Sequence, residues 1–189
     1  MKRYENYQHC STPWIKEVPS HWSKLRYKDI MRPKDVKVGD DLPTLLSLTK
    51  GGVIIRDISD GKGKFPSDFS TYKVVVPNDF IMCLFDVDET PRTVGIAHND
   101  GMITGAYDIF NIVNANRDFL LYHFLYLDDK KALKPLYKGL RKVVPLPSLL
   151  SSYVYLPPIN EQEAIVEYLN SKTSKIDSYV AERERVTVA

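Results

Sequence analysis

Basic residues gather in two stretches of the chain whose side chains could bind phosphate. The fifteen positions from Asp128 to Lys142 hold six basic and two acidic residues, a net charge of +4 in a chain whose total is only +2. A second group alternates with glycines, which allow a backbone to approach a ligand closely. Lysine and arginine beside phosphates supply the salt-dependent part of nucleic-acid affinity, although such runs also occur on solvated loops. The candidates are Lys130, Lys131, Lys134, Lys138, Arg141 and Lys142 in the first stretch, and Lys50, Arg56, Lys62 and Lys64 in the second.

Side chains that could read the edges of bases are fewer. Arginine can bond guanine through two donors, and asparagine can bond adenine in a similar way. Any one such residue is more often a plain surface residue than a base reader, so the sequence alone leaves both interpretations open. The chemically suitable residues are Thr49, Arg56, Arg92, Asn99 and Arg141.

The sequence carries no convincing catalytic or metal-binding pattern. Its histidines have no spacing typical of a metal site or a triad, no serine lies in a G-x-S-x-G elbow, and Cys10 and Cys83 lack metal-ligand spacing. The proline pair at 157–158 lacks the neighbours of the Pro-Pro-aromatic motif of DNA methyltransferases. Two Asp-x-Lys patterns, at 60–62 and 128–130, resemble a nuclease motif but recur by chance in charged chains. We therefore expect no enzymatic activity, no metal and no cofactor.

The hydrophobic pattern predicts an α+β scaffold for these candidate residues. Short apolar runs bounded by turn residues predict strands. Residues 118–127 are apolar on all sides, which predicts a helix that is not a free surface element. The spacing is typical of a small mixed or antiparallel β-rich domain with a few helices, followed by a long C-terminal amphipathic helix. The predicted strands cover residues 25–30, 72–76, 80–85, 94–97 and 107–113.

The segments between these elements have their own signals. Residues 1–12 are polar, and we expect them to be loosely ordered, whereas Trp14 and Trp22 are expected to anchor the entry segment on the domain. Glycines within 51–63 predict turns or a long loop, and Asn99-Asp100-Gly101 predicts a turn between two strands.

The clearest predicted element follows the proline pair, which ends the preceding extended segment. Asn160 is expected to cap the helix, with Glu163 completing a capping-box-like pair. Without Gly or Pro, the helix is predicted to reach Arg185, a length of roughly 39 Å at about 1.5 Å per residue. Only its first turns can pack on the parent domain, so an apolar stripe farther along predicts helix pairing. The stripe consists of Ile165, Leu169, Ile176 and Val180; the expected division is a domain over 1–158 and a helix over 159–189.

The residues around this helix start resemble a known family. The run LPPINEQEAIVEYLNSKTSKID, at 156–177, is similar to the conserved helical region of the specificity (S) subunits of type I restriction-modification enzymes, where Pro-Pro-x-x-Glu-Gln-x-x-Ile opens a long helix. Looser similarities to the target-recognition domain of these subunits follow the same order along the chain. They lie at 18–22 (VPSHW), 72–79, 101–107 (GMITGAY) and 138–142 (KGLRK).

The resemblance implies a non-catalytic protein that reads one half of a bipartite target in double-stranded DNA with the basic residues named above. Type I modification (methyltransferase) subunits would dock on the helix and bring S-adenosylmethionine, and a restriction subunit would join indirectly. Family members usually carry two recognition domains, whereas this sequence has no internal repeat. The chain therefore resembles one half, which would form a homodimer or pair with a second half-subunit.

The expected location is the cytoplasm, with no membrane partner, because the sequence lacks a secretory signal and an apolar stretch near the roughly 18 residues of a membrane helix. Two alternatives stay open. The chain could be a protein-interaction or assembly module, or an inactive fragment of a subunit, and in neither case would it read DNA. A steep fall of DNA affinity with ionic strength would distinguish DNA contact from both.

Overall fold

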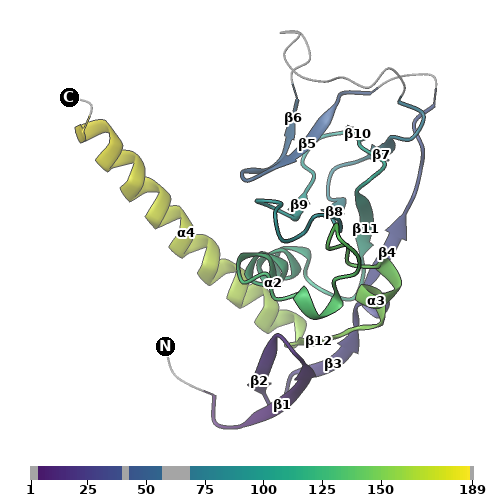
Figure 1. Ribbon diagram of the computed structural model, residues 1–189. Helices are drawn as coiled ribbons and strands as arrows, with labels where there is room; N and C mark the ends of the chain where they lie inside the picture. The colour runs from purple at the N-terminus through teal and green to yellow at the C-terminus, as the bar shows by residue number, and fades with distance from the viewer. Residues whose placement is uncertain (1–3, 40–42, 57–68, 188–189) are drawn as a thin grey trace.

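The computed structural model describes residues 4–39, 43–56 and 69–187, which form an α+β domain and a long helix that projects from it (Figure 1). All pairs of named strands are antiparallel, so the predicted fold class is confirmed. The strands are β1 (Tyr7–Thr12), β2 (Ile15–Pro19), β3 (Ser23–Arg26), β4 (Met31–Lys34), β5 (Leu46–Thr49), β6 (Gly52–Ile55), β7 (Lys73–Val75), β8 (Phe80–Met82), β9 (Val94–Ile96), β10 (Gly101–Ile103), β11 (Asp108–Ile112) and β12 (Tyr153–Leu156). The helices are α1 (Tyr27–Ile30), α2 (Arg117–Asp129), the 3-10 helix η1 (Lys134–Leu136), α3 (Leu146–Ser151) and α4 (Ile159–Thr187).

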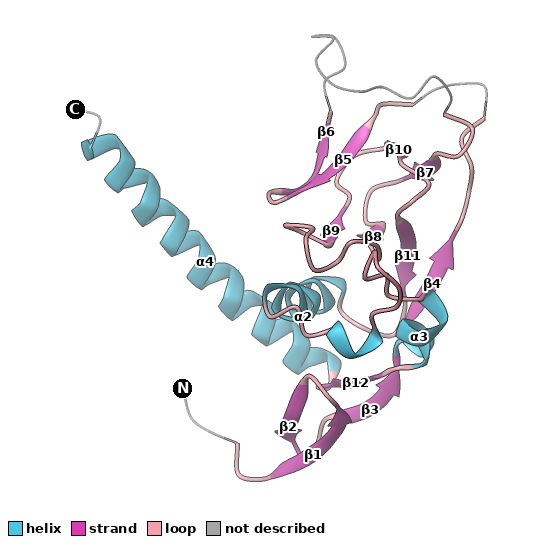
Figure 2. Ribbon diagram, in the orientation of Figure 1, coloured by secondary structure: helices cyan, strands magenta, loops and turns pink. Residues whose placement is uncertain are grey.

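A four-stranded sheet in the order β4-β11-β8-β9 lies at the centre of the domain. Successive side chains of a strand point to opposite faces, so each strand serves two cores. Phe80, Met82 and Phe110 enter the larger core, which α2 covers, whereas Ile81 and Ile109 enter a smaller core. The strand pairs β5–β6 and β7–β10 cover this second face (Figure 2). The central sheet therefore holds α2 on one side and the β5–β6 hairpin on the other.

Helix α2 confirms the prediction of a buried helix and extends slightly beyond the predicted ends. It begins at a cap, because the Asn116 side-chain oxygen accepts the backbone N–H of Phe119 at 2.9 Å. Phe119, Leu120, Phe124 and Leu127 are all buried in the larger core. Burial of one helix face against the sheet, rather than helix propensity, is what stabilises such a segment.

The N-terminal segment differs from the prediction of loose order. Residues 7–12 form β1, which pairs with β2 as a hairpin. The backbone N–H of Ser11 donates to the hydroxyl of Tyr155 at 2.9 Å, and Tyr155 lies on β12 at the other end of the domain sequence. Trp14 and Trp22 pack against the larger core, as expected. The polar β1 sequence gives no local strand signal, and its contact with Tyr155 joins residues that are distant in the chain.

Three other local predictions need correction or refinement. The predicted strand at 25–30 divides into β3 and α1, since Tyr27 and Ile30, three residues apart, are both fully buried on one helical face. Gly101 begins β10 instead of closing a turn, and a side chain there would collide with the Thr44 carbonyl. The turn predicted at Gly51 is correct, but it closes the β5–β6 hairpin, which was not predicted. The glycines at 61 and 63 lie outside the described residues.

Helix α4 begins at Ile159, so the predicted cap at Asn160 is wrong. The Pro158 carbonyl accepts the N–H groups of Glu161 at 2.9 Å and Gln162 at 3.0 Å, so Asn160 already lies within the first turn. The side chains of Glu161 and Gln162 bond to other parts of the chain instead of to their own helix.

Among the residues that the structure describes, no helix is long and apolar enough to cross a membrane.

Candidate nucleic-acid interface

The predicted basic stretch ends in a tight turn from Lys138 to Val143. These two residues exchange backbone hydrogen bonds, with the Lys138 N–H to the Val143 carbonyl at 2.8 Å and the reverse bond at 3.0 Å. Gly139 and Lys142 adopt left-handed backbone conformations, with φ of 65° and 44°. Glycine accepts this conformation without strain, which explains its place in the turn.

Three of the six cations of this stretch are bound to acidic residues of the segment 86–89. Arg141 contacts the Asp86 carboxylate at 2.5 Å, and Lys142 and Lys134 contact Asp88 at 2.9 Å and 3.4 Å. The hydrogen bond from Arg141 lowers the pKa of Asp86 below its usual value, and the bond from Lys142 lowers the pKa of Asp88. The sequence prediction of an uncompensated positive cluster therefore overstated its charge, because the neutralising carboxylates lie about fifty residues earlier.

Lys131 and Arg92 share the buried carboxylate of Asp128. Lys131 Nζ donates to Asp128 at 2.8 Å and to the Thr90 carbonyl at 2.8 Å, and its side chain is mostly covered. Arg92 lies 4.0 Å from the other oxygen of Asp128, which also accepts the Thr93 N–H at 3.0 Å. Lys131 therefore links the C-terminal end of α2 to the segment before β9.

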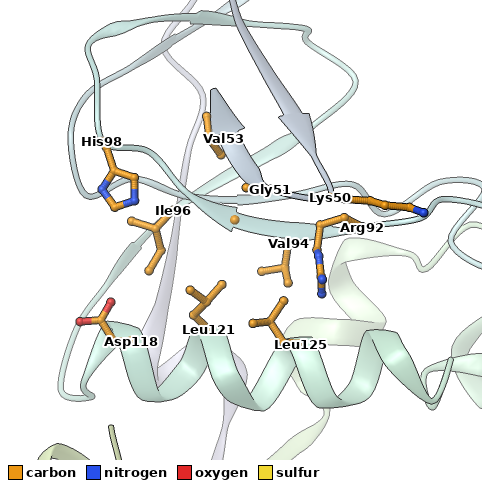
Figure 3. Close-up of a pocket in the computed structure, with 12 residues that line it drawn as sticks. Lys50, Gly51, Val53, Arg92, Val94, Ile96, His98, Asp118, Leu121 and Leu125 are labelled. Carbon is orange, nitrogen blue, oxygen red and sulfur yellow. The ribbon is translucent and has the colours of Figure 1, made fainter. Parts of the chain in front are cut away.

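Lys50 and Arg92 come together at a cleft between the β5–β6 hairpin, β9 and α2. The cleft holds about 220 Å³ and has an apolar floor that includes Leu121 and Leu125 of α2. Figure 3 shows Lys50 and Arg92 on one side of it, with His98 and Asp118 on the other. Lys50 is exposed on the tip of the hairpin and, within the described part of the chain, has no acidic partner.

The remaining DNA-binding candidates vary in accessibility. Lys138 is exposed and has no acidic partner in the described ranges, whereas exposed Lys130 lies 3.5 Å from the neighbouring Asp129. Arg56 is exposed directly after β6. Thr49, a possible base reader, instead donates its hydroxyl to the Gly52 carbonyl at 3.0 Å inside the hairpin turn. Lys62 and Lys64 lie outside the described residues.

The base of α4 is held by a cluster of bonds that sequence reasoning missed. The Glu161 carboxylate accepts from the Tyr4 hydroxyl at 2.6 Å, contacts His21 Nε2 at 2.7 Å and accepts from Trp22 Nε1 at 3.1 Å. Its neighbour Gln162 is buried and bonds to a different part of the chain, on the other side of the helix base. Its side chain accepts the N–H of Asn116 at 2.8 Å, just before α2, and donates to the Pro157 carbonyl at 2.8 Å. We call Glu161, Tyr4, His21 and Trp22 the helix clamp.

Partial burial acts to raise the pKa of Glu161, but the hydrogen bonds from Tyr4, His21 and Trp22 outweigh it and hold the pKa below its usual value. The same bond to Glu161 raises the pKa of Tyr4 to about 12. Both shifts have the direction expected when donors stabilise a carboxylate. The carboxylate of the clamp is therefore ionised over the physiological pH range.

The apolar stripe of α4 divides into a covered and an uncovered part. Val166, which was not predicted, is buried in the larger core, and Ile165 packs against it. Farther along, Asn170 accepts a bond from the Tyr122 hydroxyl of α2 at 2.7 Å. Beyond this point Ile176 is 61% exposed and Val180 is 48% exposed. The distal turns of α4 thus present apolar side chains away from the domain.

Solved structures from type I restriction-modification systems share this fold. The HsdS subunit from Thermoanaerobacter tengcongensis matches 91% of this chain with a TM-score of 0.56 and 17% identity. The S subunit from M. genitalium matches 90% with a TM-score of 0.53 and 15% identity. A chain from a structure that describes complex assembly and conformational transition of the type I R-M system matches 86% with a TM-score of 0.59 and 16% identity.

These matches cover 41%, 44% and 40% of the respective longer chains. No protein-family model matches the sequence, and no curated protein matches it significantly. Two of the three matches cover nine tenths of this chain, and because α4 has 29 residues they include at least part of this helix as well as the domain. The chain therefore has the fold of the specificity subunits of type I restriction-modification systems, over a length of about two fifths of those subunits.

Proposed function

We propose that this chain is a non-catalytic DNA-recognition element, one half of a type I specificity subunit. Residues 1–158 would read one part of a bipartite target, and the helix over 159–189 would carry the partner contacts. The single observation that carries the proposal is the fold shared with HsdS over 91% of the chain. The long helix that follows the domain, with exposed Ile176 and Val180, also supports the proposal.

The DNA-facing part of the proposal draws on the surface charges. Lys50 and Lys138 are exposed and unpaired within the described ranges, so their charge is available to phosphate. Arg56 and Lys130 are also exposed, and Arg92 lies on the same cleft as Lys50. Four other cations instead stabilise the surface through ion pairs with Asp128, Asp86 and Asp88. They are Lys131, Lys134, Arg141 and Lys142.

The partner-facing part of the proposal concerns α4. Its exposed apolar side chains would pair with an equivalent helix, in a homodimer or with a second half-subunit, and modification subunits would dock on the pair. Those subunits, and not this chain, would bring S-adenosylmethionine and the methylation of adenine. A protein-interaction module that binds no DNA is the competing function, since exposed apolar positions on a helix serve either one.

The experiment that tests the proposal is co-expression of this chain with a modification subunit, followed by sequencing of methylated adenines in the host DNA. A methylation motif that arises only when this chain is present is the expected result, and a symmetric motif would identify a homodimer. The matched control is the modification subunit alone. A stable complex that produces no motif would favour the interaction module.

A further inference from the structure

One leucine stands fully in solvent on the turn at the end of the basic stretch. Leu140 is 101% exposed, so its side chain buries nothing against the domain. Single exposed leucines are common and need no explanation by themselves. Leu140 differs from such residues because the turn that presents it is held in one conformation from several sides.

The first restraint on the turn is its backbone. Lys138 and Val143 exchange two hydrogen bonds, and the Lys142 N–H donates to the Gly139 carbonyl at 3.2 Å across the tip. At the base of the turn, the Val144 N–H donates to the Leu84 carbonyl at 2.8 Å, which ties the turn to the segment after β8. The tip therefore projects from a closed, hydrogen-bonded loop.

The second restraint is a set of contacts to the segment 85–88. Arg141 makes a two-point contact with Asp86, through Nη2 at 2.5 Å and Nε at 3.2 Å, and its guanidinium lies over the Phe85 ring at 5.2 Å. The Asp86 N–H donates back to the Arg141 carbonyl at 2.8 Å. Lys142 binds Asp88 at 2.9 Å. The side of the turn that follows Leu140 is thus fixed before any partner binds.

The charges around Leu140 favour an anionic partner. Lys138, two residues before it, is exposed and unpaired within the described ranges, and the side chain of Arg141, directly after it, is 69% exposed despite its pairing. The nearby carboxylates are already compensated, Asp86 by Arg141, Asp88 by Lys134 and Lys142, and Glu89 by Lys142 at 3.6 Å. An apolar tip bracketed by cations suits a groove whose walls are phosphates and whose floor is bases.

We propose that Leu140 is a specificity-determining residue that contacts a base step of double-stranded DNA, with Lys138 on a flanking phosphate. This inference rests on the proposed function. An apolar side chain can touch the thymine methyl group in the major groove or enter a base step from the minor groove. Because the turn is already fixed, binding would require little ordering of this segment.

The test compares methylation motifs produced by wild type, Leu140→Ala and Lys138→Ala, each co-expressed with a modification subunit. Leu140→Ala is expected to relax one base pair of the recognised half-site, with a loss of discrimination of about tenfold. Lys138→Ala is the matched control in the same turn, and it is expected to reduce methylation at every site without changing the motif. Since Leu140 buries nothing, the melting temperature of Leu140→Ala should equal that of wild type.

Each outcome separates this inference from the function on which it rests. If wild type yields no motif, the proposed function fails and this role for Leu140 fails with it. If wild type yields a motif and Leu140→Ala yields the same one with equal occupancy, the inference alone is overturned. Loss of the complex with the modification subunit, measured by gel filtration of Leu140→Ala, would also overturn it, because the leucine would then contact protein.

Discussion

The indole Nε1–H of Trp22 donates to the Glu161 carboxylate at 3.1 Å and joins the N-terminal segment to the first turn of α4. The ring of Trp22 is positioned by an edge contact with Phe119 of α2, with centroids 6.2 Å apart. Two of the segments that resemble specificity subunits, at 18–22 and 156–177, are therefore in direct contact. Together with Gln162 on the opposite side, the clamp holds the base of α4 on two sides.

Trp22→Phe should weaken the clamp while retaining most of the packing on Phe119. The variant loses one hydrogen bond to a charged, partly exposed acceptor, so we expect a loss of about 1 kcal/mol in the free energy of unfolding. Amide hydrogen exchange in the first turns of α4 should also become faster than in wild type. Glu163→Gln is the matched control, because Glu163 lies in the same turn but is exposed. Equal exchange rates in Trp22→Phe and wild type would show that the bond does not restrain the helix.

The clamp should make stability depend on pH in a known direction. The folded-state pKa of Glu161 lies below its usual value of 4.5, so the unfolded state binds a proton more readily than the folded state. The stabilisation from this carboxylate is therefore fully present above about pH 5.5 and is lost as the pH falls through the folded-state pKa. Urea unfolding of wild type and Glu161→Gln should show their largest difference near neutral pH and a shrinking one in acid. A difference that grows as the pH falls would contradict this assignment.

Local signals in the sequence were sufficient for three of the four strands of the central sheet, but not for β4 or for the surface built on the sheet. The strands β8, β9 and β11 lie within predicted ranges because their β-branched and aromatic runs end at turn residues. Strand β1 was missed, since its sequence is polar and the bond from Ser11 that holds it to Tyr155 spans 144 residues. A similar separation hid the contacts of Glu161, whose partners Tyr4, His21 and Trp22 lie 139 to 157 residues earlier.

The basic residues illustrate a similar limit. Composition identified the stretch from 128 to 142, but it did not reveal that Asp86 and Asp88 neutralise Arg141 and Lys142, because these carboxylates lie 55 and 54 residues away. Only the structure shows that the Lys138 side chain is exposed whereas the Lys131 side chain is mostly covered. A charge count along the sequence therefore locates a candidate surface but does not rank its residues.

The uncovered part of the α4 stripe should mediate pairing if the helix binds a second copy. Ile176→Asp with Val180→Asp places two charges on side chains that are 61% and 48% exposed, so folding should be unaffected. We expect this double variant to be monomeric in light scattering, in contrast to a dimeric wild type. Ser171→Asp with Ser178→Asp adds the same charge to another face of the same turns and should leave the dimer intact. A double variant that stays dimeric would place the interface elsewhere.

Gly95 should be intolerant of a side chain. It lies on β9 against the β5–β6 hairpin, and a Cβ atom there would lie 2.8 Å from Leu48 Cδ1 and 2.9 Å from Val53 Cγ2. Gly95→Ala should therefore push the hairpin away and reduce the free energy of unfolding by about 1–3 kcal/mol. Gly51→Ala, in the same hairpin, meets only Thr49 Oγ1 at 3.7 Å and serves as the control. Equal stability of the two variants in thermal unfolding would mean that β9 and the hairpin separate readily.

Lys50 and Lys138 should carry a measurable part of the electrostatic DNA affinity. Both are exposed and unpaired within the described ranges, so each can replace a counterion at one phosphate. Replacing both with alanine should reduce the slope of log affinity against log salt by about 2, since each phosphate contact contributes about 0.9. Lys16→Ala with Lys28→Ala removes the same charge from exposed positions on β2 and α1, and β2 lies at the opposite end of the domain from the β5–β6 hairpin (Figure 1). Titration of fluorescent duplex DNA at several salt concentrations measures both slopes. A reduction of equal size in the two double variants would mean that net charge, and not this surface, governs binding.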